Sequence, residues 1–169
     1  MPLMPETDVP KLSLWLPELT KTVGTPDESL YLIGHSAGAA VILGATQRLP
    51  ANSVERIVLL APGVSCRHDL RCALTASRCG IDNFFSRDDD FLIGCTALFG
   101  TTDGKDTRAA GELGFVPMTA TKADAELYRK LCQHPWRAEY AEFGYYGGHL
   151  GVARKTFLAH AVVPMLKTP

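Results

Sequence analysis

The sequence predicts an α/β fold, with a mostly parallel sheet flanked by helices. Two short apolar segments, residues 30–33 and 56–61, have the length and β-branched content of buried strands. Between them, residues 37–49 are rich in helix-forming types, and this strand–helix–strand order is typical of a right-handed βαβ unit. Residues 81–86 add a third predicted strand. A length of 169 residues fits one domain, so we expect residues 1–169 to form a single α/β domain.

The other predicted elements follow from spacing. Apolar residues at helical intervals predict a covering helix over 12–23, interrupted at Pro17. A helix is predicted over 122–132, inside a region (107–136) that we expect to act as a lid or cover. Alternation predicts a half-buried edge strand over 138–143, and a final helix is expected over 152–162.

Composition narrows the function classes. The net charge of −1 with 21% charged residues gives no reason to expect a nucleic acid or an anionic membrane as partner. No apolar run approaches the roughly 20 residues of a membrane span, and the first residues lack the basic and apolar regions of a secretory signal. The five cysteines are odd in number and lack CxxC pairs, which predicts reduced thiols in a cytoplasmic protein.

A metal centre is not expected. Cys66, His68, Cys72 and Cys79 lie close in sequence, but their spacing matches no zinc pattern. We therefore predict a protein without a metal or an organic cofactor.

The segment Gly34-His35-Ser36-Ala37-Gly38 is the strongest functional motif. This G-x-S-x-G sits between a predicted strand and a predicted helix, the context in which it marks a nucleophile elbow. We expect side chains at Gly34 and Gly38 to collide with the flanking elements. Ser36 would then occupy a strained, exposed corner. The alternative is a glycine-rich turn with an inactive serine.

Two further segments carry candidate catalytic groups. Asp88, Asp89 and Asp90 follow the strand predicted over 81–86, and catalytic groups gather at the carboxyl ends of strands in an open α/β sheet. The alternative is a solvated acidic turn or a helix N-terminus stabilised by acids. His149 lies between glycines, after a predicted strand and before the final helix, where a loop histidine has room to reach sideways.

The order Ser36, acid, His149 is that of α/β-hydrolases, and the sequence resembles this superfamily of serine hydrolases and esterases. The resemblance covers roughly residues 28–166 and is closest to bacterial α/β-hydrolases with a GHSAG elbow. It implies Ser36 as the nucleophile, His149 as the base and an aspartate after Arg87 as the acid. Spacing from Arg87 favours Asp89, with Asp88 and Asp90 as alternatives. The segments that carry it are residues 32–40, 58–65, 85–89, 100–115 and 147–151.

The resemblance implies a carboxylic-ester hydrolase that forms an acyl-enzyme on a small-molecule acyl substrate, with the Ala37 N–H in the oxyanion hole. One alternative is a non-catalytic α/β-hydrolase-like module, and another is an acyltransferase that uses the same triad. Members of the superfamily have several strands before the elbow and a loop there that gives a second oxyanion donor. We expect an N-terminally shortened fold here, with one flank of the elbow strand bare. A truncated gene model, a shortened natural variant and a half that a homodimer completes are the three alternatives.

Overall fold

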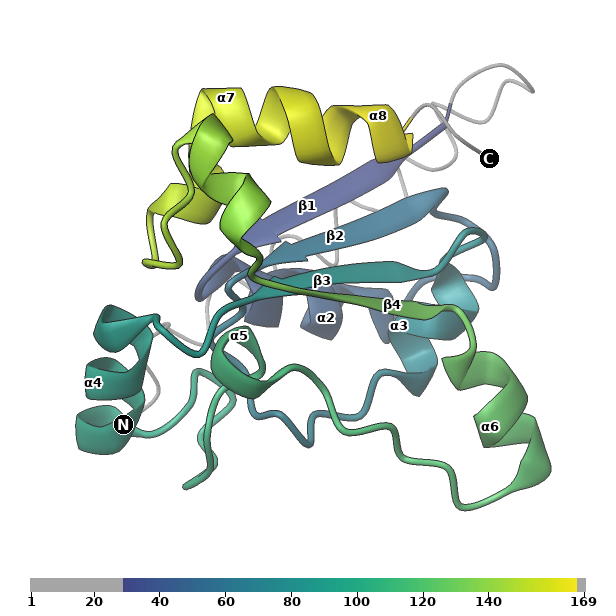
Figure 1. Cartoon of the computed structure of the whole chain (residues 1–169). Coiled ribbons are helices and arrows are strands. Elements are labelled where there is room, and N and C mark those ends of the chain that lie inside the picture. The colour runs from purple at the N-terminus through teal and green to yellow at the C-terminus, as the bar shows by residue number, and fades with distance from the viewer. Residues whose placement is uncertain (1–28, 167–169) are drawn as a thin grey trace.

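The computed structural model describes residues 29–166 and contains a four-stranded sheet of order β1-β2-β3-β4. All three strand pairs are parallel; for example, Gly34 pairs with Leu59 and Leu60 with Phe84. The predicted α/β class with a parallel sheet is confirmed (Figure 1). The helix predicted over 12–23 lies outside the described residues. The strands are β1 (Tyr31–His35), β2 (Arg56–Leu60), β3 (Ile81–Phe85) and β4 (Leu131–Pro135).

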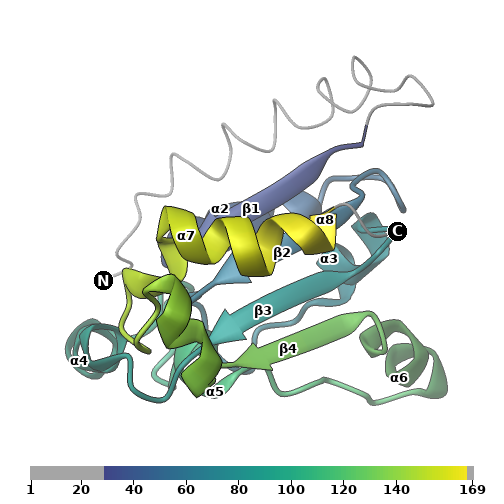
Figure 2. The same ribbon diagram turned by 45° about the horizontal axis from the view of Figure 1, so that its top comes forward.

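Helices cover both faces of the sheet. One face carries α2 (Gly38–Thr46) and α3 (Arg71–Ala76), and α7 (Lys155–Phe157) and α8 (Val163–Leu166) lie on the other (Figures 1 and 2). A π-helical segment, Leu158–Val162, joins α7 to α8. The last helical stretch therefore begins later than predicted, because Gly151–Ala153 forms a separate 3₁₀ turn. No helix within residues 29–166 is long and apolar enough to cross a membrane.

Each face of the sheet has its own apolar core. Leu32, Ile57, Leu59 and Ile81 pack toward α2 and α3, while Val58, Leu60 and Phe84 face the C-terminal helical stretch. Because consecutive strand residues point to opposite faces, strands buried on both sides must be apolar almost throughout. This explains the continuous apolar run of β2.

Two predicted elements are wrong. The helix predicted over 122–132 ends early, as α6 (Lys122–Tyr128), and the following residues form β4. Pairing with β3 overrides local helix propensity, because the Ile81 N–H donates to the Lys130 carbonyl and the ladder continues to Pro135. The region expected to be a lid thus supplies a strand of the sheet. It also contains the short helix α5 (Ala110–Leu113).

The second wrong element is the edge strand predicted over 138–143, which is a 3₁₀ helix, η1 (Ala138–Phe143). Tyr140 and Phe143 both pack against the second core. They are three residues apart, which is one turn of a 3₁₀ helix, so they reach the same side. An extended strand would have placed them on opposite sides.

The carboxyl ends of the strands share one edge of the sheet, beside α4 (Asp90–Phe99) (Figure 2). The elbow follows β1, Pro62 and Gly63 follow β2, and the acidic segment follows β3. Parallel pairing therefore gathers the loops that the sequence marked as functional.

Candidate active site

The elbow holds Ser36 in a strained backbone conformation. Its φ is 54°, in the left-handed region that non-glycine residues rarely adopt. The Ser36 N–H donates to the Leu60 carbonyl at 3.0 Å, and the Ser36 carbonyl accepts from Gly63 N–H at 3.1 Å and Ala39 N–H at 3.2 Å. These bonds tie the turn to the end of β2 and offset the strain.

The two elbow glycines differ in how closely other atoms approach them. A Cβ at Gly34 would lie 2.8 Å from the Ile42 side chain and 3.2 Å from the Ala39 backbone, so Gly34 lets α2 approach β1. A Cβ at Gly38 would meet nothing within 4 Å. The collision predicted at Gly38 is therefore wrong, because this residue is already inside α2 and points into open space.

Ser36, His149 and Asp89 form a continuous hydrogen-bonded chain. His149 Nε2 lies 2.8 Å from Ser36 Oγ, and His149 Nδ1 lies 2.7 Å from Asp89 Oδ2. A carboxylate only accepts, so Nδ1 carries a proton and Nε2 accepts from the serine hydroxyl. The His149 and Asp89 side chains are 5% and 1% exposed, which shields their bond from competing water.

Asp89 is the aspartate of its segment that faces the histidine. Asp88 and Asp90 are exposed. Asp89 Oδ1 also accepts from the Leu92 N–H at 2.9 Å, so the same carboxylate caps α4. Asp89 therefore caps the helix with one oxygen, and its other oxygen faces His149 in the position that the catalytic interpretation requires.

The residues just before His149 hold its loop in place through packing and a hydrogen bond. Tyr145 is buried against Phe157, and its carbonyl accepts from Trp136 Nε1 at 2.9 Å. Burial raises the pKa of the Tyr145 phenol, so it stays neutral. Gly147 has φ +89°, and a Cβ there would lie 3.1 Å from Ser86 Oγ. A glycine at this position lets the loop pass close to the acid segment.

Two rings enclose the imidazole. The His35 ring centroid lies 4.8 Å and the Phe91 centroid 4.9 Å from that of His149. His35 Nε2 also donates to the His149 carbonyl at 3.0 Å. His35 therefore links the elbow directly to the loop that carries His149.

The Ala37 N–H lies at the start of α2 and has no hydrogen-bond acceptor within residues 29–166. Free N–H groups at a helix N-terminus attract negative charge. This is the donor that the sequence suggested for an oxyanion.

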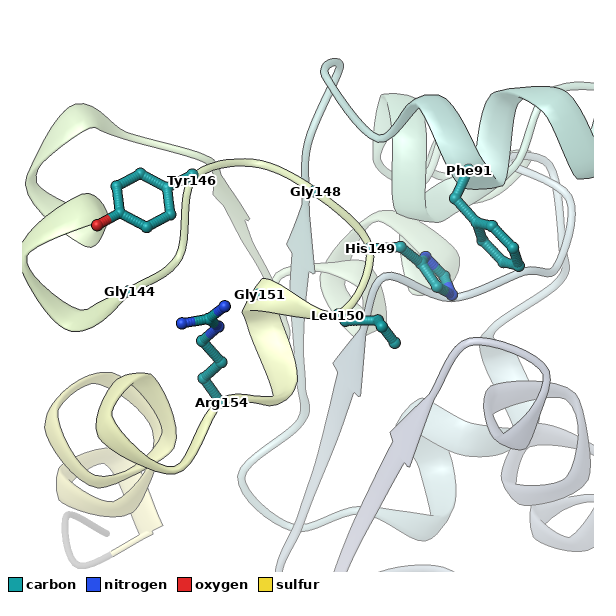
Figure 3. Close-up of a pocket in the computed structure, with 8 residues that line it drawn as sticks. All are labelled: Phe91, Gly144, Tyr146, Gly148, His149, Leu150, Gly151 and Arg154. Atoms are coloured by element: carbon teal, nitrogen blue, oxygen red, sulfur yellow. The ribbon is translucent and has the colours of Figure 1, made fainter.

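A pocket of about 430 Å³ opens beside His149. Its lining includes the side chains of Phe91, Tyr146, Leu150 and Arg154, together with three glycines of the His149 loop and the turn after it (Figure 3). Sequence reasoning missed these wall residues. Phe91 directly follows the acid segment and Leu150 directly follows His149, so neighbours of the candidate residues were the available signal. The region 107–136, expected to be a lid, contributes no wall to this pocket.

A second group of serine, histidine and aspartate joins two loops: Ser65 and His68 follow β2, and Asp103 follows α4. His68 Nδ1 is 2.9 Å from Asp103 Oδ2, and Asp103 Oδ1 accepts from the Ser65 N–H at 2.9 Å. Burial alone would raise the pKa of Asp103, but hydrogen bonds from His68, Thr101 and Ser65 hold it well below its usual range. The Ser65 hydroxyl pairs with Thr107, not with His68.

Two further histidines, His134 and His160, and the acid Asp69 have structural partners. His134 Nε2 is 2.7 Å from Asp82 Oδ1, and His160 Nδ1 is 2.8 Å from the Thr156 carbonyl. Asp69 forms an exposed ion pair with Arg71. Within residues 29–166, no three His, Cys, Asp or Glu side chains converge as metal ligands would.

Comparison with known proteins supports a serine hydrolase. A family model described as "Serine hydrolase" matches residues 4–79, which is less than half of the chain. The matched part includes Ser36 and ends before Asp89 and His149. No match was found among curated proteins, and none among solved structures.

Proposed function

We propose that this protein is a serine hydrolase of the α/β-hydrolase superfamily that cleaves carboxylic esters through an acyl-enzyme. The observation that carries the proposal is the chain of two short hydrogen bonds from Asp89 through His149 to Ser36. A serine in a merely structural turn has no reason to face an imidazole that a buried carboxylate orients.

The first half of the reaction forms the acyl-enzyme. As the Ser36 oxygen bonds to the ester carbon, His149 Nε2 takes the hydroxyl proton. The Ala37 N–H and the start of α2 stabilise the negative oxygen that develops. Asp89 keeps the proton on Nδ1 and stabilises the imidazolium. His149 then gives its proton to the leaving alcohol as the carbon–oxygen bond breaks.

The second half releases the acid. Water enters where the alcohol left, and His149 removes its proton as the water oxygen attacks the acyl carbon. The proton returns to Ser36 Oγ when the acyl–serine bond breaks, which restores the starting state. Deacylation thus uses the same base and the same oxyanion donor.

Labelling with a fluorophosphonate tests the proposal, because this reagent reacts with an activated serine whatever the substrate. We expect one adduct by intact mass, mapped by peptide analysis to Ser36. It should disappear in Ser36→Ala and in His149→Ala. A folded wild-type protein without an adduct would contradict the proposal and favour a non-catalytic module.

A further inference from the structure

We infer that the pocket beside His149 binds the leaving group of the ester and that Arg154 recognises a carboxylate on it. The substrate class is then an ester of a hydroxy acid, in which the hydroxyl is acylated and the carboxylate is free. This inference rests on the proposed function and adds to it the chemistry of the departing alcohol.

The position of the base assigns the pocket to the leaving group. His149 must deliver its proton to the leaving oxygen, so the alcohol must lie on the His149 side of Ser36. His149 and its neighbour Leu150 are themselves walls of the pocket. A leaving group in contact with His149 Nε2 therefore extends into this space.

The near part of the pocket is apolar. Phe91 is 62% and Leu150 74% exposed, although both are large hydrophobic side chains next to the imidazole. Burying them under a ligand would be favourable, at about 25 cal/mol per Å² of apolar surface removed from water. A hydrocarbon or aromatic portion of the alcohol fits here.

The far part of the pocket is cationic. Figure 3 shows the Arg154 guanidinium beyond Leu150, in the part of the pocket that Tyr146 also lines. No acidic residue lines the pocket, and none within residues 29–166 forms an ion pair with Arg154. A single guanidinium matches a carboxylate, which it binds through two parallel N–H groups.

The backbone keeps space for this arginine. A Cβ at Gly144 would lie 3.2 Å from Arg154 Cδ and 3.4 Å from Arg154 Nη1, so the arginine lies directly on the glycine. The Thr156 hydroxyl donates to the Phe143 carbonyl and joins the two segments next to that contact. The side chain is thus packed across the loop, although it remains exposed to solvent.

Two fluorogenic acetates that differ by one carboxylate test the inference: 7-acetoxycoumarin-4-acetic acid and 4-methylumbelliferyl acetate. The readout is the ratio of kcat/KM for the anionic ester to that for the neutral one. We expect Arg154→Ala to lower this ratio about three- to tenfold, mainly through KM. The effect is limited because an exposed ion pair contributes only a small free energy to binding. Arg154→Lys should restore part of it, and added salt should lower it in the wild type.

Lys155→Ala is the matched control, because it removes an adjacent exposed charge that does not line the pocket. Its ratio should equal that of the wild type. An unchanged ratio in Arg154→Ala, or an equal fall in Lys155→Ala, would overturn the inference while Ser36-dependent turnover leaves the proposed function standing. If neither acetate is cleaved in a Ser36-dependent way, the proposed function fails and the inference fails with it.

Discussion

The described residues, 29–166, contain two groups of serine, histidine and aspartate that differ in how their members are bonded. In the first, the imidazole of His149 stands between Asp89 and Ser36. In the second, Asp103 is central and binds both His68 and the backbone of Ser65. The hydroxyl of Ser65 is engaged with Thr107 and has no base.

Their backbones differ in the same sense. Ser36 has a positive φ in a tight turn between strand and helix, whereas Ser65 has no such angle. The Asp103 group joins the loop of residues 100–107 to the segment after β2, where the Thr102 N–H also donates to the Gly63 carbonyl at 2.9 Å. The comparison teaches that the position of the histidine, and not the presence of three residue types, decides whether such a group has the connectivity of a catalytic triad.

Replacing each of the two serines by alanine should give the largest difference in ester turnover between the two groups. We expect Ser36→Ala to lower ester turnover by about 10⁴-fold or more, because the nucleophile is lost. Ser65→Ala should keep turnover within about threefold, since its hydroxyl only supports a loop. Initial rates on 4-methylumbelliferyl acetate measure both. A comparable loss in Ser65→Ala would remove the distinction between the groups.

Exchanging the two aspartates should separate catalysis from stability. Asp89→Asn keeps the shape but favours the wrong imidazole tautomer, and we expect kcat to fall by about 10⁴-fold. Asp103→Asn should lower the thermal midpoint and change kcat by less than about tenfold. Asp88→Asn and Asp90→Asn are controls of equal charge change on exposed neighbours. If Asp88→Asn or Asp90→Asn were the slow variant, the acid would be misassigned.

The glycines before His149 offer a finer test of the first group. At Gly147 a methyl group would crowd Ser86 and Asp88 at a φ of +89°. We expect Gly147→Ala to slow fluorophosphonate labelling by about ten- to 100-fold, because a small displacement of the base is costly. Gly148→Ala places its methyl in open space and should label at nearly the wild-type rate. Equal labelling rates for the two variants would mean that the close contact of Gly147 with the acid segment does not position His149.

Low pH should destabilise the folded protein through Asp103 of the second group. The pKa of Asp103 is lowered in the folded state, so its stabilising contribution is full well above the unfolded value of about 3.9 and is lost as pH falls below it. The thermal midpoint of the wild type should therefore fall more between about pH 5 and pH 2 than that of Asp103→Asn. Parallel curves for the two proteins would show that Asp103 carries no such linkage.

Local sequence signals were sufficient for the first half of the fold. The strands and helix around Ser36 have strong apolar patterns within a short stretch, and their expected order matches the structure. The second half depends on distant partners. β4 is a strand because β3 supplies its hydrogen bonds. Residues 138–143 form a 3₁₀ helix because Tyr140 and Phe143 pack into one core. No local pattern encodes either partner.

The candidate site divides in the same way. Motif context selected Ser36, the segment around Asp89, and His149, and the structure brings these three side chains together. The pocket escaped prediction because Phe91, Tyr146 and Arg154 become neighbours only when α4 meets the loop of residues 144–151. The collision predicted at Gly38 does not occur, because a glycine in a motif need not be crowded by its neighbours.

The separation of 113 residues between Ser36 and His149 has a consequence for biosynthesis. A ribosome makes Ser36 long before it makes His149, and the four strands lie side by side in the order in which they are made. A nascent chain that has formed β1, α2 and β2 already presents Ser36 on its turn, but as an ordinary alcohol. Under the proposed mechanism, Ser36 gains its base only when the loop of residues 144–151 has folded against the elbow, so a chain that does not yet contain His149 would not attack esters.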